Sequence, residues 1–233
     1  MSQSRLVQEL QEKSKEVKKY CLFLKAIETK AIKLSMGNHL TDKNKIKDFN
    51  PELEKTLKAT VFLLLYNLIE STIRSVIEYI YDDLEKNHVS FDNLNQTFQN
   101  HIIKVLRDFS LKDKDWQPGI ATNIIIFAAE KEGSFAGNLD AKKIREILGF
   151  YGIQVTSQGR TTRNGNDLEI VKEARKDLAH GHSSFSEKSR NYTSDDLFAI
   201  QKRVVLYLRG IVQDVENYVN EQEYLSLPSD NSS

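Results

Sequence analysis

The stretch KATVFLLLYNLIESTIRSVIEYIYDDL, residues 58–84, decides the fold class of this chain. Its apolar side chains cover most of the circumference of a helix and leave only a narrow polar strip. Asn50 followed by Pro51 supplies a cap and a first-turn proline, so the helix is expected to run from Pro51 to about Lys86. This segment predicts an all-α protein.

The same stretch contains the longest apolar segment of the chain, but Asn67, Glu70 and Arg74 interrupt it within about two turns. We therefore expect no membrane-spanning helix. Residues 1–19 are charged throughout and lack the apolar segment of a secretory signal. Cys21 is the only cysteine and cannot form an internal disulfide, which fits a reducing compartment. The sequence thus predicts a cytoplasmic protein without a membrane partner.

The N-terminal region has its own apolar periodicity. Leu10, Val17, Leu24 and Ala31 recur every seven residues and predict a long amphipathic helix over roughly residues 4–35. A polar segment follows, up to residue 50. We predict an N-terminal helix and linker over 1–50, a helical domain over 51–224, and a disordered tail over 225–233.

Further helices are expected at residues 91–109, 141–150, 167–180 and 194–218. Residues 111–119 combine charge with proline and glycine and indicate a loop. Residues 152–167 are rich in Gly, Ser, Thr and Asn, which predicts a mobile loop or a short hairpin. Only ten glycines and three prolines interrupt the chain, so this composition disfavours a β-rich fold.

One segment carries candidate chemistry. The sequence VKEARKDLAHGHSSF, residues 171–185, places Arg175 five positions before His180, with Gly181 at the end of the same predicted helix. This arrangement resembles the Arg-x4-6-His signature of HEPN domains. The segments YNLIESTIR at 66–74 and GNLDAKKIREIL at 137–148 also resemble the MAE-type HEPN-like nuclease family. The resemblance covers about residues 55–222. Lys176 stands where that family often has Asn, Asp or His, and Asp177 follows one place later.

The resemblance implies a HEPN-type helical bundle, usually a twofold dimer, that cuts RNA without a metal ion or other cofactor where two copies of the motif meet. It implies that Arg175 and His180 are the catalytic pair. The family also suggests a role in toxin and antitoxin pairs, phage defence or stress response, with an antitoxin or another regulatory protein as a further partner.

The chemistry of RNA gives a parallel reason for this pair. Attack of the 2′-hydroxyl on the neighbouring phosphate needs only proton transfer and charge stabilisation. Histidine titrates near neutrality and can move the proton, while a guanidinium can hold phosphate oxygens as negative charge develops. Five residues at about 100° each place Arg175 and His180 roughly 140° apart around a straight helix. A dimer, or a bend at Gly181, could bring the groups to one phosphate.

Neighbouring residues could assist. Lys176 lies four residues before His180, where its charge favours a neutral imidazole, and Asp177 acts in the opposite direction. Asn67, Glu70 and Arg74 belong to one polar strip of the 58–84 helix. This strip either faces solvent, or it faces the cleft, with Glu70 orienting the catalytic pair and Arg74 binding phosphate.

The chain contains 33 basic and 33 acidic residues, so any polyanion must be held locally. Residues 141–190 carry ten basic and six acidic side chains. Arg160, Arg163, Lys188 and Arg190 lie in turn-like sequence on both sides of the motif and could follow an RNA backbone, together with His182, although surface solvation explains any single one. A metal site at the His-x-His pair lacks an accompanying carboxylate or cysteine cluster, so we predict none.

Three functions are therefore open. The first is a metal-independent endoribonuclease that uses Arg175 and His180. The second is a non-catalytic RNA- or nucleotide-binding helical module, and the third is a protein-interaction scaffold whose first helix docks a partner. The first is favoured because both residues of the motif are intact.

Overall fold

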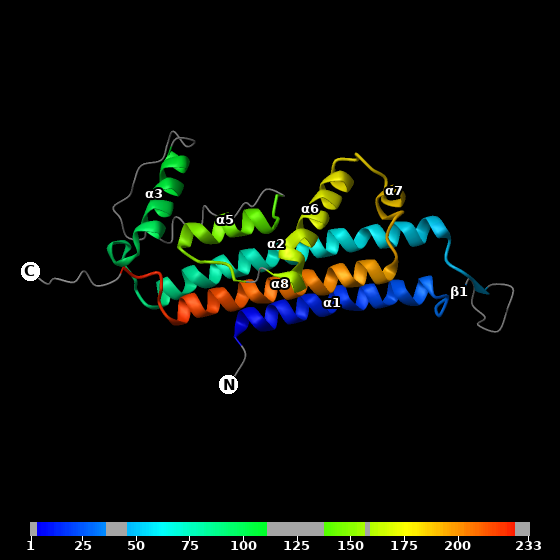
Figure 1. Cartoon of the computed structure of the whole chain (residues 1–233), viewed down its shortest axis with the longest axis horizontal. Coiled ribbons are helices and arrows are strands. Elements are labelled where there is room, and N and C mark those ends of the chain that lie inside the picture. The colour runs from blue at the N-terminus through cyan, green and yellow to red at the C-terminus, as the bar shows by residue number, and fades with distance from the viewer. Residues whose placement is uncertain (1–3, 36–45, 111–137, 157–158, 227–233) are drawn as a thin grey trace, which may run out of the picture.

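The computed structural model describes residues 4–35, 46–110, 138–156 and 159–226. Three long helices lie side by side along the molecule (Figure 1): α1 (Arg5–Glu28), α2 (Pro51–Lys86) and α8 (Ser194–Asn220). The shorter helices α3 (Gln96–Ser110), α5 (Ala141–Tyr151), α6 (Asn166–Ala179) and α7 (Phe185–Ser189) lie along the side of α2 away from α1. This architecture confirms the all-α prediction.

The central helix α2 has the bounds that the sequence predicts. The Asn50 side chain accepts a hydrogen bond from the Glu52 backbone N–H, and Pro51 occupies the first turn. The side chains of α2 that are completely buried include Phe62, Leu65 and Ile69. Helices α1, α6, α7 and α8 all contact α2, so its burial on several sides explains its nearly continuous apolar sequence.

Helix α2 is also the one helix in the described ranges whose length and composition would allow it to cross a membrane. An 18-residue window within it has a mean hydropathy of 1.3, and 56% of that window is buried inside the protein. A core helix passes the same test, and the contacts of α2 with its neighbours give its apolar character a structural reason. The absence of a membrane partner stays a prediction.

Helix α1 ends earlier than its heptad pattern predicts. It ends at Glu28, Lys30 has a left-handed φ of 59°, and the short strand β1 (Leu34–Ser35) pairs antiparallel with β2 (Ile46–Lys47). Ala31 and Leu34 are exposed, so the last positions of the repeat do not contact the core and do not extend the helix. The expected end near residue 35 was therefore wrong.

The buried face of α1, which includes Leu10, Val17 and Leu24, belongs to the same core as α2 and α8. Cys21 is also buried there, and burial raises the pKa of its thiol to about 11. The division of the chain at residue 50 stays a prediction, although α1, which precedes that boundary, packs against α2 and α8, which follow it.

The segment before α6 is more ordered than its composition suggests. A 3₁₀ helix, η3 (Arg160–Gly165), occupies six residues of the expected loop, and Arg163, Asn164 and Gly165 all adopt left-handed backbone conformations. Gly165 fits because its α-carbon lies against Ala141 and Tyr207, leaving no room for a side chain. At residues 160–165, close packing of η3 against α8 thus replaces the expected mobile loop or hairpin.

Other segments differ in detail from the expected helices. The helix predicted at 91–109 is divided into η2 (Phe91–Asn93) and α3. At the expected disordered tail, Leu225 pairs with Leu94, and the Ser226 backbone N–H donates to the Asn93 carbonyl at 2.9 Å. These two residues of the tail are therefore fixed, while its remainder and the loop at 111–119 lie outside the described residues.

Candidate functional site

Helix α6 is held firmly at its N-terminal half. The carboxylate of Asp167 is completely buried and accepts hydrogen bonds from Arg203 of α8 at 2.6 and 3.0 Å and from Arg163 at 3.3 Å. Lys172 donates to Asp140 at 2.6 Å, and Asp140 also caps the N-terminus of α5. These ion pairs fix the helix that carries the motif against α5 and α8.

Arg175 lies on the side of α6 that faces α2. Its guanidinium carbon lies 5.0 Å from the centre of the Tyr66 ring, a cation–π contact, and Arg175 is only half-buried. The Tyr66 hydroxyl accepts a hydrogen bond from the Leu139 backbone N–H at 3.3 Å. The hydrogen bond to Leu139 thus holds the Tyr66 ring in place, and the ring supports the Arg175 guanidinium at a partly open surface.

The charges around this ring come from both helices. Burial raises the pKa of Tyr66, the charge of Glu70 raises it further, and the charges of Arg175 and Lys172 lower it. Glu70 forms an ion pair with Arg74 at 3.8 Å, one turn along α2. The contacts therefore place Tyr66, rather than Glu70, directly against Arg175.

The polar strip of α2 was expected to face either solvent or the cleft, and the structure shows part of each. Asn67 and Arg74 are exposed to solvent, while Glu70 is half-buried beside Tyr66. The strip thus borders the α2–α6 contact at one edge and faces solvent at the other. The roles of these three residues stay predictions.

His180 follows the last residue of α6. Its backbone N–H donates to the Lys176 carbonyl at 3.0 Å, and Gly181 then adopts a left-handed φ of 69°, which ends the helix as the sequence predicts. The His180 side chain is exposed, and its ring centre lies 5.7 Å from that of His182. The imidazole of His180 is therefore presented to solvent at the helix end.

Asp177 connects this end of α6 to the short helix α7. It accepts a hydrogen bond from Lys188 at 2.6 Å, and its carboxylate lies 3.9 Å from Nδ1 of His182. The hydrogen bond from Lys188 lowers the pKa of Asp177 below its usual range. Lys176 lies 4.0 Å from Glu173. Asp177 is thus close enough to His182 to interact with it electrostatically, and its hydrogen bond with Lys188 joins the end of α6 to α7.

Arg175 and His180 have different neighbours although they share one helix. The former contacts α2, and the latter lies at the open end of α6 beside His182. Helix α6 is regular through Ala179, so it contains no bend that would turn the Arg175 and His180 side chains toward each other.

The comparison with protein-family models decides the family. The model of the HEPN family described as MAE_28990-like matches residues 2–224. The chain belongs to this MAE-type HEPN family. Membership confirms the resemblance seen in the motif, and at the level of the superfamily it makes the chain a nuclease-like or RNA-related module. No curated protein and no solved structure matches the chain.

The predicted RNA-contacting residues of this HEPN chain fall into two groups. Lys188 and Arg190 lie in or beside α7, which follows the motif, and His182 lies 3.9 Å from Asp177, the carboxylate that pairs with Lys188. Arg160 and Arg163 lie in η3 at the opposite end of α6, a helix of 14 residues that is about 20 Å long. The structure therefore does not bring all five side chains together in one copy.

The sequence missed contacts that position the motif of this HEPN chain, among them Tyr66 with Arg175 and Asp140 with Lys172. Both join residues that are distant in the chain. A local signal existed for Asp140, which lies directly before an amphipathic segment as a capping residue does. Among the described residues, no group of three or more His, Cys, Asp or Glu side chains could hold a metal ion.

Proposed function

We propose that this HEPN protein is a metal-independent endoribonuclease in which Arg175 and His180 act on the scissile phosphate. One observation carries the proposal: the Arg175 guanidinium rests on the fixed ring of Tyr66 at a partly open surface, and His180 is exposed at the end of the same helix. A supported guanidinium and an accessible imidazole are the two groups that RNA transesterification needs.

In the proposed reaction, an imidazole removes the proton of the RNA 2′-hydroxyl, and the 2′-oxygen forms a bond to the adjacent phosphorus. The bond from phosphorus to the 5′-oxygen breaks, and that oxygen receives a proton from an imidazolium. The products are a 2′,3′-cyclic phosphate and a 5′-hydroxyl. Arg175 holds the phosphate oxygens through two N–H donors while their negative charge increases.

We further propose that two copies form the complete site. Arg175 faces α2 of its own chain, whereas His180 is exposed beyond the end of α6. A twofold contact near this end would place the His180 imidazole of each copy beside the motif of the other copy. One imidazole would then act as the base, and the other, as imidazolium, would act as the acid. If the site needs both imidazoles, an excess of inactive His180→Asn chains should suppress wild-type cleavage by forming mixed dimers, whereas a monomeric active enzyme would contradict the shared site.

Cleavage of a labelled RNA in excess EDTA tests the chemistry. We expect the wild-type protein to cut and to leave a 2′,3′-cyclic phosphate, and we expect His180→Asn to be inactive because an amide cannot titrate near neutrality. His88→Asn is the matched control: His88 is exposed after the end of α2, and asparagine tolerates its φ of 50°. Equal loss in both variants, or cutting that EDTA abolishes, would contradict the proposal.

The alternative of a non-catalytic RNA- or nucleotide-binding module makes a different prediction. Such a protein would bind RNA, lose affinity in Arg175→Lys, and show no cleavage by the wild type. The nuclease is favoured because the His180 side chain is presented to solvent, and its contact among the described residues is with the ring of His182.

A further inference from the structure

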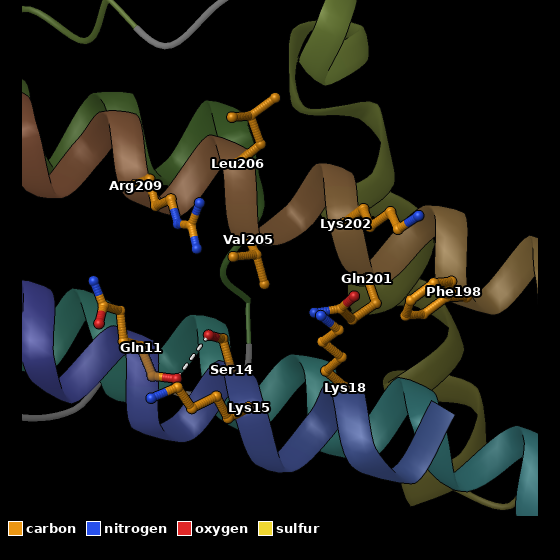
Figure 2. Close-up of a pocket in the computed structure, with 10 residues that line it drawn as sticks. All are labelled: Gln11, Ser14, Lys15, Lys18, Phe198, Gln201, Lys202, Val205, Leu206 and Arg209. Carbon is orange, nitrogen blue, oxygen red and sulfur yellow. Dashed lines mark hydrogen bonds between the residues drawn. The ribbon is translucent and has the colours of Figure 1, made fainter. Parts of the chain in front are cut away.

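A groove lies between α1 and α8, on the side of these helices that faces away from α2 (Figure 2). Its volume is about 460 Å³, within the range of sites that hold small organic molecules. Arg209 and Val205 point from α8 toward α1, and Lys18 points from α1 toward α8. None of the lining residues belongs to the Arg175 and His180 site.

The lining is strongly cationic. Lys15, Lys18, Lys202 and Arg209 all line the groove, and no acidic residue does. Within the described part of the chain, none of these four cations lies within ion-pair distance of a carboxylate. The chain as a whole has equal numbers of basic and acidic residues, so four unpaired positive charges in one groove are a local excess that an anion would compensate.

The groove also has parts that suit an organic group. Gln201 is 4% exposed and lines it, and no group among the described residues hydrogen-bonds its side-chain amide. The amide atoms are not among the buried polar atoms without a partner, so they stay open to the groove and can hydrogen-bond a ligand there. Phe198 and Val205 add apolar surface, and Lys202 lies 4.4 Å from the centre of the Phe198 ring.

The ends of the groove limit the size of its occupant. Lys25 of α1 pairs with Asp195 of α8 at 2.6 Å beyond one end, and the Ser4 hydroxyl donates to Glu216 beyond the other. The lining residues of α8 extend from 198 to 209, about 16 Å along a helix. Side-chain contacts thus bridge the two helices on both sides, which favours a compact ligand over a nucleic-acid strand that runs along the seam.

We propose that this groove binds a small organic polyphosphate, with the four cations holding the phosphate groups and Gln201 and Phe198 contacting the organic part. The inference is independent of the proposed nuclease activity, because it uses another face of the molecule. Lysine and arginine are the usual phosphate ligands in proteins, and three or four negative charges match the charge of the groove.

Calorimetric titration of the full-length protein at about 0.15 M salt tests the proposal, since attraction between distant charges is largely screened there. The probes are tripolyphosphate, ATP and inositol hexakisphosphate. We expect saturable binding of at least one probe at one site per chain. Lys18→Gln with Lys202→Gln should weaken it about tenfold, since each lost contact involves an exposed cation.

The matched control is Lys19→Gln with Lys86→Gln, which removes the same charge from exposed helical positions outside the groove and should change the Kd less than about twofold. Thermal melting checks that both double variants fold. Gln201→Leu should weaken ATP or inositol hexakisphosphate but not tripolyphosphate, which separates contacts to the organic part from contacts to phosphate.

Three results would overturn the proposal. The first is no saturable binding of any probe up to about 1 mM, and the second is equal weakening in the groove and control variants, which would indicate diffuse attraction. The third is loss of binding to a six-nucleotide single-stranded RNA in the groove variant with no effect on the small probes. That result would make the groove an RNA contact.

Discussion

Replacement of Gly165 by alanine tests how the packing of η3 and α5 positions α6. Gly165 is the residue before α6, with a left-handed φ of 82°. A β-carbon there would lie 2.4 Å from the β-carbon of Ala141 and 3.0 Å from Cε2 of Tyr207. Carbon atoms normally approach to about 3.5–4.0 Å, so either α5 or the start of α6 must move by about 1 Å.

The expected loss of stability has two parts. An alanine at this φ costs about 1–2 kcal/mol, and overpacking in a well-packed core costs about 1–3 kcal/mol. Gly165→Ala should therefore reduce the free energy of unfolding by about 2–5 kcal/mol. Gly152→Ala is the matched control, because its φ is 91° and its nearest contact would be an ordinary 3.5 Å to Asn95. It should cost only the strain of about 1–2 kcal/mol.

Equilibrium urea unfolding of the two variants measures this difference, provided that the m-values stay equal. A difference below about 0.5 kcal/mol would refute the reasoning, since it would lie within the range of neutral surface substitutions. In the nuclease assay, Gly165→Ala should also lower cleavage, because α6 carries Arg175 and is followed directly by His180.

Three further predictions concern the supports of α6. Asp167→Asn should cost about 2–4 kcal/mol in urea unfolding because it removes the buried partner of Arg203, whereas the exposed first-turn Glu169→Gln should cost less than about 1 kcal/mol; equal losses would exclude the buried ion pair as the cause. Burial raises the pKa of Asp140, but the hydrogen bonds that it accepts, first that from Lys172, lower it more, so its net pKa is depressed in the folded state. The carboxylate thus stabilises the fold above its unfolded pKa of about 3.9, and the stability advantage over Asp140→Asn should shrink as the pH falls from about 6 to about 3. Tyr66→Leu should reduce RNA cleavage about 2- to 30-fold through loss of the cation–π contact with Arg175. Tyr66→Phe keeps the ring and should leave cleavage unchanged. Equal losses in the two variants would assign the effect to the Tyr66 hydroxyl instead of the ring.

The sequence predicted those parts of the molecule whose signals are local. The Asn50-Pro51 start of α2 and the glycine at the end of α6 follow from capping chemistry, and both are confirmed. The end of α1 was missed because the heptad pattern continues to Ala31, where the chain has already left the core. Whether a position of the heptad pattern is buried depends on which other helices pack against it. The pattern within one segment does not contain that information.

The candidate site was predictable in its residues but not in its arrangement. Arg175 and His180 follow from a motif six residues long, so their identity needed no tertiary information. The support of Arg175 by Tyr66 joins positions more than a hundred residues apart. The η3 turn depends on the close approach of Gly165 to α5 and α8. Composition alone predicted a loop for this segment, because it contains no information on that approach.

The charge distribution gives a second argument for two copies at the proposed site. Several cations of residues 141–190 are already paired in the structure, because Arg163, Lys172 and Lys188 each pair with a carboxylate. Among the described residues near the motif, Arg175 and Arg190 remain outside ion pairs. Two cations hold a polyanion weakly at physiological salt, whereas a twofold contact would double them around one phosphate chain. Geometry and electrostatics therefore favour the same shared site.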